Sequence, residues 1–104
     1  MKKIIFILSA VILLTASHPW ENKRIAYLGD SITDPKGVEA TRYWGFLEEW
    51  LHSESYVYGI SGRPWKHILT KANRLKQEHG AEVDGIMIFM GTNDYNSGTP
   101  IGEW

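Results

Sequence analysis

The sequence predicts an α/β fold with a parallel sheet, and three observations favour it. Short apolar runs that suit strands alternate with longer amphipathic segments that suit helices, in the order β-α-β-α-β. The last run, Ile86-Met87-Ile88-Phe89-Met90, is nearly continuous, which is typical of a strand covered on both faces. Each predicted strand is followed by polar residues, where the crevice of an open parallel sheet lies.

The strands are expected near residues 24–28, 55–58 and 83–90. The first is a short apolar run that ends at Gly29, and the second is a β-branched and aromatic run that ends at Gly59. Because helices separate them, we expect the strands to be parallel, with right-handed crossovers.

The first helix is expected at residues 41–52, with Thr41 as its N-cap. Its apolar residues recur with helical spacing and are expected to face the sheet: Tyr43, Leu47, Trp50 and Leu51.

The second helix is expected at residues 64–79, with Pro64 in its first turn and Gly80 as its stop. An apolar stripe should face the sheet: Trp65, Ile68, Leu69, Ala72 and Leu75. The residues between them should form a solvated face: Lys66, Lys71, Arg74, Lys76, Gln77 and Glu78.

The first residues have the pattern of a secretory signal peptide, which we place at 1–17, followed by a linker at 18–23. Lys2 and Lys3 precede an apolar run over 4–14 that is shorter than the ~20 residues of a membrane-spanning helix. A buried first strand is the alternative. The signal predicts cleavage between Ala16 and His18 and an exported protein, periplasmic or secreted, without a stable membrane span after cleavage.

Composition restricts the class of partner. The chain has 104 residues and a formal net charge of −1, without a basic run, which argues against nucleic acid. The absence of cysteine excludes disulfides and thiolate metal sites.

Three short motifs follow the three strands: Gly29-Asp30-Ser31, Ile60-Ser61-Gly62 and Gly91-Thr92-Asn93-Asp94. They offer a hydroxyl nucleophile at Ser31, a glycine N–H at Gly62 or Gly59, and a neutral amide donor at Asn93. Each could have a local role instead, since serine and asparagine are common in caps and turns and glycine serves positive φ. Their order along the chain favours a joint site for acyl transfer.

Together these motifs resemble the SGNH (GDSL) family of serine esterases and lipases, over residues 24–104. The resemblance implies a flavodoxin-like three-layer α/β/α fold, of which this chain would be the N-terminal part. It implies that Ser31 is the nucleophile and that Gly62, rather than Gly59, forms the oxyanion hole with Asn93. The expected substrates are small-molecule or carbohydrate esters, including lipid, acyl and acetyl-sugar esters, cleaved through an acyl-enzyme without cofactor or metal.

The family's fourth motif, Asp-x-x-His, does not occur before Trp104. None of the four histidines, His18, His52, His67 and His79, follows an aspartate at that spacing. The chain by itself is therefore expected to lack the general base and to be inactive.

Two other function classes compete with the esterase. A non-catalytic module on the same fold could bind small molecules or carbohydrates, with Trp65, Tyr95 and Trp104 available for stacking. A nucleotide-binding domain is disfavoured, because the chain has neither of the glycine-rich phosphate-binding patterns.

Overall fold

The computed structural model describes residues 19–36 and 40–104, which form an α/β fold. Strands β1 (Arg24–Gly29), β2 (Glu54–Gly59) and β3 (Gly85–Phe89) make a parallel sheet in the order β2-β1-β3. The predicted fold class is confirmed, and the arrangement is consistent with part of a flavodoxin-like α/β/α fold. The proposed signal peptide at 1–17 lies outside the described residues, so export stays a prediction.

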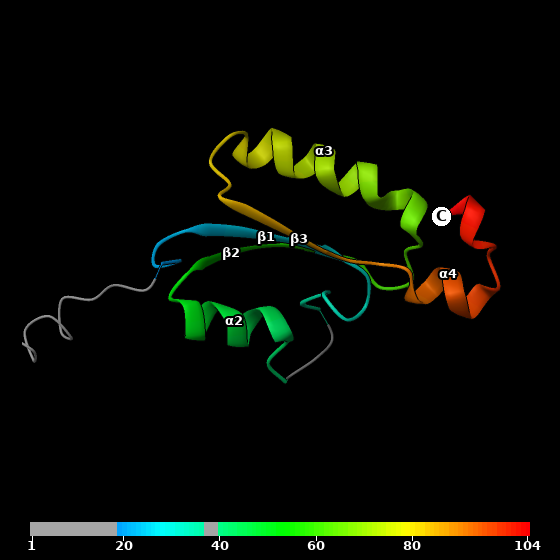
Figure 1. Cartoon of the computed structure of the whole chain (residues 1–104), viewed down its shortest axis with the longest axis horizontal. Helices are drawn as coiled ribbons and strands as arrows, with labels where there is room; N and C mark the ends of the chain where they lie inside the picture. The colour runs from blue at the N-terminus through cyan, green and yellow to red at the C-terminus, as the bar shows by residue number, and fades with distance from the viewer. Residues whose placement is uncertain (1–18, 37–39) are drawn as a thin grey trace, which may run out of the picture.

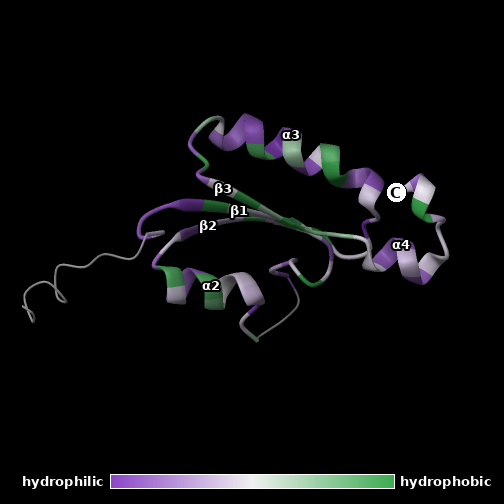
Figure 2. Ribbon diagram, in the orientation of Figure 1, coloured by the Kyte–Doolittle hydropathy of each residue, from purple (hydrophilic) through white to green (hydrophobic). Residues whose placement is uncertain are grey.

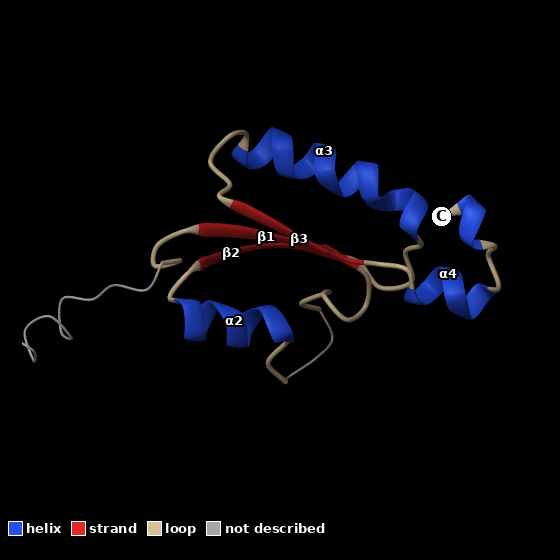
Figure 3. Ribbon diagram, viewed as in Figure 1, coloured by secondary structure: helices blue, strands red, loops and turns tan. Residues whose placement is uncertain are grey.

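Helices cover the two faces of the sheet. Helix α2 (Tyr43–Leu51) connects β1 to β2, and α3 (Ile68–His79) connects β2 to β3 after a short 3₁₀ turn, η1 (Trp65–His67). Figures 1 and 3 show α2 and α3 on opposite sides of the strands. This follows from the strand order, since the chain moves from β1 to one neighbour and then back across to the other.

The core lies around β1, the central strand. Figure 2 shows hydrophobic colour along β1 and β3, whereas α3 is largely hydrophilic. On the α3 side, the buried hydrophobic residues form a cluster of Ala26, Leu28, Tyr58 and Leu75. On the α2 side, the ring of Tyr43 lies 5.8 Å from that of Tyr27 and 5.9 Å from that of Phe89.

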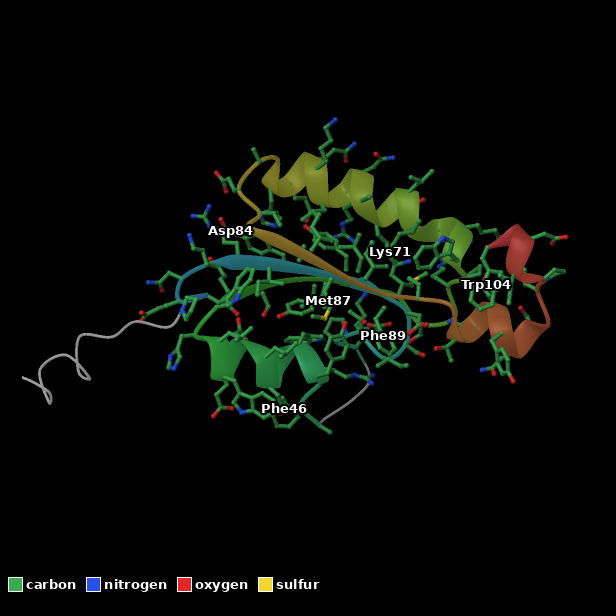
Figure 4. All side chains as sticks on the ribbon, in the orientation of Figure 1. Phe46, Lys71, Asp84, Met87, Phe89 and Trp104 are labelled. Atoms are coloured by element: carbon green, nitrogen blue, oxygen red, sulfur yellow. The ribbon has the colours of Figure 1, made fainter. Side chains whose placement is uncertain are left out.

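Strand β3 is not covered on both faces, contrary to the prediction. It is an edge strand, and its side chains from Ile86 to Phe89 are between 41% and 59% exposed. Figure 4 shows Met87 and Phe89 on the side of β3 that faces α2. Among the described residues, α3 packs mainly on β1 and α2 mainly on β2, so both faces of β3 are left half-exposed.

The predicted helix faces need three corrections. Trp50 is 66% exposed, and its ring lies 6.0 Å from that of Phe46, outside the core. Leu69 is 71% exposed, whereas Lys71, assigned to the solvated face, is only 3% exposed. The reason for this exchange is η1: three residues per turn there advance the chain faster than an α-helix, so the stripe extrapolated from Trp65 is rotated.

The ends of the chain segments also differ in detail. Helix α2 begins at Tyr43 with Arg42 as its N-cap and no side-chain cap, so the Thr41 assignment is wrong, whereas Gly80 caps α3 as predicted. After β3 the structure adds two elements that the sequence analysis missed, α4 (Thr92–Ser97) and η2 (Ile101–Glu103). No helix within residues 19–36 and 40–104 has the length and apolarity to cross a membrane.

Candidate functional site

The three motifs meet at the edge where the strands end, called here the carboxyl edge. Gly29 is in register with Gly59 on one side and with Phe89 on the other, so the strands end level with one another. The loops that carry Ser31, Gly62 and Asn93 therefore leave the sheet side by side. Helix α2 returns from β1 and α3 from β2 on opposite faces, which places a topological switch point at this edge.

Two buried aspartates join the loops. Asp34, after β1, accepts hydrogen bonds at Oδ2 from the Ser61 backbone N–H (2.9 Å) and from the Ser61 hydroxyl (3.0 Å), after β2. Asp94, after β3, accepts one at Oδ2 from the Trp65 backbone N–H, at 2.8 Å. Hydrogen bonds of this kind to charged acceptors are the stronger ones, so the carboxyl edge is a linked unit.

The turn that carries Ser31 is tight and closely packed on the sheet. The carbonyl of Asp30 accepts the backbone N–H groups of Thr33 and Asp34, at 3.1 and 2.9 Å. Thr33 is fully buried; its hydroxyl lies 2.9 Å from the Tyr43 hydroxyl, and its carbonyl accepts the Trp44 indole N–H. Through these two hydrogen bonds, helix α2 holds the turn in place.

Ser31 itself is exposed at this turn. Within the part of the chain that the structure describes, its hydroxyl has no hydrogen-bond partner. A serine that serves only as a helix cap or turn residue would donate a hydrogen bond to, or accept one from, the nearby backbone. The Ser31 side chain makes no such bond.

The two candidate glycines differ in their surroundings. A Cβ on Gly59 would come within 2.4 Å of the backbone of Thr33 and Asp34, so Gly59 lets the loop after β1 pack closely. Gly62 has φ of +76°, and nothing lies within 4 Å of where its Cβ would be. Gly62 is therefore the glycine with open space in front of it.

Asn93 lies in the first turn of α4 and is half-buried. Its Nδ2 donates to the carbonyl oxygen of Arg63, at 3.2 Å, which ties the amide to the loop after β2. One of the two amide N–H groups is thereby fixed, and the other is left to act as a donor.

Of the three described histidines, one lies near the carboxyl edge. His52 and His79 are at the C-terminal ends of α2 and α3, which lie at the other edge, and the His79 ring stacks on Tyr56 at 3.6 Å. His67 is in η1, which follows the loop after β2, and no hydrogen bond connects it to Ser31. Within residues 19–36 and 40–104, no group of three or more acidic or histidine side chains could hold a metal ion.

Sequence reasoning missed three residues that shape this edge. Asp34 and Asp94 were visible beside the motifs, but their long-range partners were not. Lys71 could have been found from its spacing, since it lies one turn after Ile68 and one turn before Leu75 on the inner face of α3.

The Asp34 carboxylate provides a pH-dependent test of this linkage. Backbone hydrogen bonds, first from Lys36 and then from Ser61, hold the pKa of Asp34 below its ordinary value despite burial. The ionised Asp34 carboxylate therefore stabilises the folded state fully above about pH 4. This contribution is lost as the pH falls through the lowered pKa of Asp34. We expect Asp34→Asn to lower the free energy of unfolding at pH 7 by about 1–3 kcal/mol.

Urea unfolding at pH 7 and pH 3 measures this effect. The difference between wild type and Asp34→Asn should shrink at the lower pH, whereas Glu49→Gln, a change at an exposed α2 carboxylate, should have little effect at either pH. An Asp34→Asn chain as stable as wild type at pH 7 would contradict the linkage.

Comparison with known proteins supports the fold. No protein-family model and no curated protein matches the chain. It is similar to a solved Lactobacillus plantarum protein, with 29% identity and a TM-score of 0.63, over 81% of this chain and 41% of that one. It is also similar to a proposed platelet activating factor from Streptococcus pneumonia, with 21% identity and a TM-score of 0.54, over 99% of this chain and 49% of that one. The chain thus spans less than half the length of either protein.

Proposed function

We propose that the protein is a serine ester hydrolase of the SGNH type, with Ser31 as the nucleophile. The observation that carries the proposal is the linked carboxyl edge. An exposed serine hydroxyl, without a hydrogen-bond partner among the described residues, lies at the same edge as Gly62 and Asn93. A glycine N–H and an amide N–H at such an edge are suitable donors for a developing oxyanion.

In the proposed reaction, the Ser31 Oγ attacks the ester carbonyl carbon while a general base takes the hydroxyl proton. The Gly62 N–H and the Asn93 amide stabilise the negative charge on the carbonyl oxygen. Collapse of this intermediate releases the alcohol, which receives the proton, and leaves an acyl group on Ser31. Attack by water then releases the acid and restores the serine.

The general base is proposed to come from an Asp–His pair outside these 104 residues. The two similar structures are more than twice as long as the part matched, so a protein of this fold can have residues beyond those matched here. Histidine is the usual base for a serine nucleophile, and the three described histidines make no hydrogen bond to Ser31.

A fluorophosphonate probe tests the proposal. We expect a longer chain that supplies an Asp–His pair to be labelled at Ser31, as located by mass spectrometry of peptides, and the 104-residue chain to be labelled little. Labelling of the longer chain at another residue, or none, would reject the proposal.

The binding-module alternative gains little from the aromatic residues. Trp104 packs on Gly91 and donates its indole N–H to the carbonyl of Thr99, at 2.8 Å, so its ring is in use within the fold. Tyr95 is 78% exposed but stands alone on α4. The esterase is therefore the better-supported function.

Asn93→Ala tests the oxyanion role. In the longer chain, the substitution should lower kcat for a short-chain aryl ester by ~10²–10³, the effect of removing one oxyanion donor, and leave KM within a few-fold. Asn96→Ala, an exposed position on the same helix, is the control and should change kcat little. A wild-type rate in Asn93→Ala, with folding confirmed by circular dichroism, would remove Asn93 from the site.

A further inference from the structure

A pocket of about 440 Å³ opens beside the carboxyl edge, between the end of β2, the segment after β1 and α3. It shares Asp34, Gly59 and Ile60 with the loops of the candidate site. Its other lining residues are Pro35, Lys36, Val57, Tyr58, Thr70, Lys71 and Arg74. The lining has three cationic side chains against one carboxylate, in a chain whose overall charge is negative.

Lys71 is the unusual member of this lining. It is 3% exposed and lies on the inner face of α3, as Figure 4 shows between that helix and the strands. Helical side chains lean toward the helix N-terminus, and the N-terminus of α3 is at the carboxyl edge. The charged groups that act on Lys71 are both at that edge, Arg63 after β2 and Asp30 after β1.

The positive charge of Lys71 is not paired with any described residue. Within residues 19–36 and 40–104, its ammonium has no hydrogen bond and no ion pair. The buried carboxylate of Asp30, which attracts it, is too far away to pair, and its Oδ2 also has no hydrogen-bond partner. Burial and the Arg63 charge lower the pKa of Lys71, which is the cost of placing an ammonium there.

The other charged groups of the lining have partners among the described residues, except Lys36. The Asp34 carboxylate is already satisfied by Ser61 and by the Lys36 N–H, at 2.9 Å. Arg74 is oriented by Glu78, at 2.8 Å, and lies over the Tyr58 ring, 5.7 Å from its centroid. Lys36 is exposed at the mouth. The apolar walls, Pro35, Val57 and Ile60, suit an organic group rather than a bare ion.

We propose that this pocket binds the anionic oxygen group, a carboxylate, phosphate or sulfate, of a small organic molecule, with Lys71 as its main partner. If the bound molecule is the substrate, the ester cleaved at Ser31 carries an acidic substituent. This second statement rests on the proposed function. A charge-assisted contact in a buried setting is stronger than one in water, so Lys71 would govern affinity and the exposed Lys36 would contribute less.

Phenyl phosphate is a suitable probe, titrated into the ¹⁵N-labelled 104-residue chain while the backbone amide shifts are followed. We expect saturable binding, with shifts at β2, α3 and the loop after β1. The Kd should rise at least tenfold in Lys71→Met and a few-fold in Lys36→Gln. It should stay unchanged in Lys66→Met, the matched control at an exposed lysine outside the pocket.

Lys71→Met and Lys36→Gln are both expected to fold, so a loss of binding can be assigned to the lost charge. Replacing a buried charge by an apolar group of similar size is often neutral or stabilising, so Lys71→Met is expected to fold, and Lys36→Gln changes only a surface side chain. Absence of saturable binding, equal binding of benzyl alcohol, or an unchanged Kd in Lys71→Met would overturn the site. Binding of inorganic phosphate as tight as that of phenyl phosphate would overturn the organic ligand and with it the acidic-ester assignment.

Failure of this inference is separable from failure of the proposed function. The titration requires no catalysis, so phenyl phosphate binding without fluorophosphonate labelling of the longer chain would reject the esterase and keep the anion site. Labelling at Ser31 without anion binding would reject the site and keep the esterase.

Discussion

Replacing Ser31 by alanine is expected to reduce ester hydrolysis by ~10⁴–10⁶-fold in a longer chain that supplies the Asp–His pair. In the proposed reaction the Ser31 hydroxyl oxygen forms the acyl-enzyme, and alanine has no group to replace it. The oxyanion donors and substrate binding would remain, so a small residual rate over water is expected rather than none. The 104-residue chain should already have this low rate if, as proposed, the general base comes from an Asp–His pair outside it.

Hydrolysis of a short-chain aryl ester measures this effect, with fluorophosphonate labelling as a second readout. Ser97→Ala is the matched control. Ser97 is an exposed serine at the end of α4 whose hydroxyl donates to the Asp94 carbonyl, at 3.1 Å, and the variant should keep the wild-type rate. Ser31-dependent hydrolysis by the 104-residue chain alone would contradict the missing base. His67, the described histidine nearest the carboxyl edge, would then be the first residue to test.

Replacing Gly59 by alanine is expected to be strongly destabilising. The added methyl group would lie 2.4 Å from the Asp34 backbone nitrogen and 2.4 Å from the Thr33 carbonyl carbon. Neither atom can move alone, because Asp34 is hydrogen-bonded to Ser61 and Thr33 to Tyr43 and Trp44. We expect a loss of roughly 3 kcal/mol or more, a large part of the stability of a small domain.

Urea unfolding of three alanine variants separates the causes. Gly102→Ala has open space around its Cβ and should change the free energy of unfolding by less than ~0.5 kcal/mol. Gly62→Ala also has space but a positive φ, and should cost about 1–2 kcal/mol. A Gly59→Ala variant no less stable than Gly62→Ala would show that the turn after β1 is not packed on the end of β2.

The alternation of apolar runs and amphipathic segments was enough to predict the α/β fold and the positions of the strands. Local pattern carries this information, because a strand and a helix each repeat their apolar residues at a fixed period. The same pattern placed Ser31, Gly62 and Asn93 just after strands, and parallel strands bring their carboxyl ends to one edge. That the segments carrying these three residues leave the same edge of the sheet therefore followed from the sequence and the topology of the fold.

Only the tertiary structure decided which residues link this edge and which are buried. Asp34 and Asp94 act through partners far away in the sequence, and no local pattern encodes such pairs. Lys71 was assigned to solvent because the period was counted through η1, whose tighter turn rotates the inner face of α3. The exposure of β3 likewise depends on where the helices pack. They lie mainly on β1 and β2, and the apolar run of β3 does not contain this information.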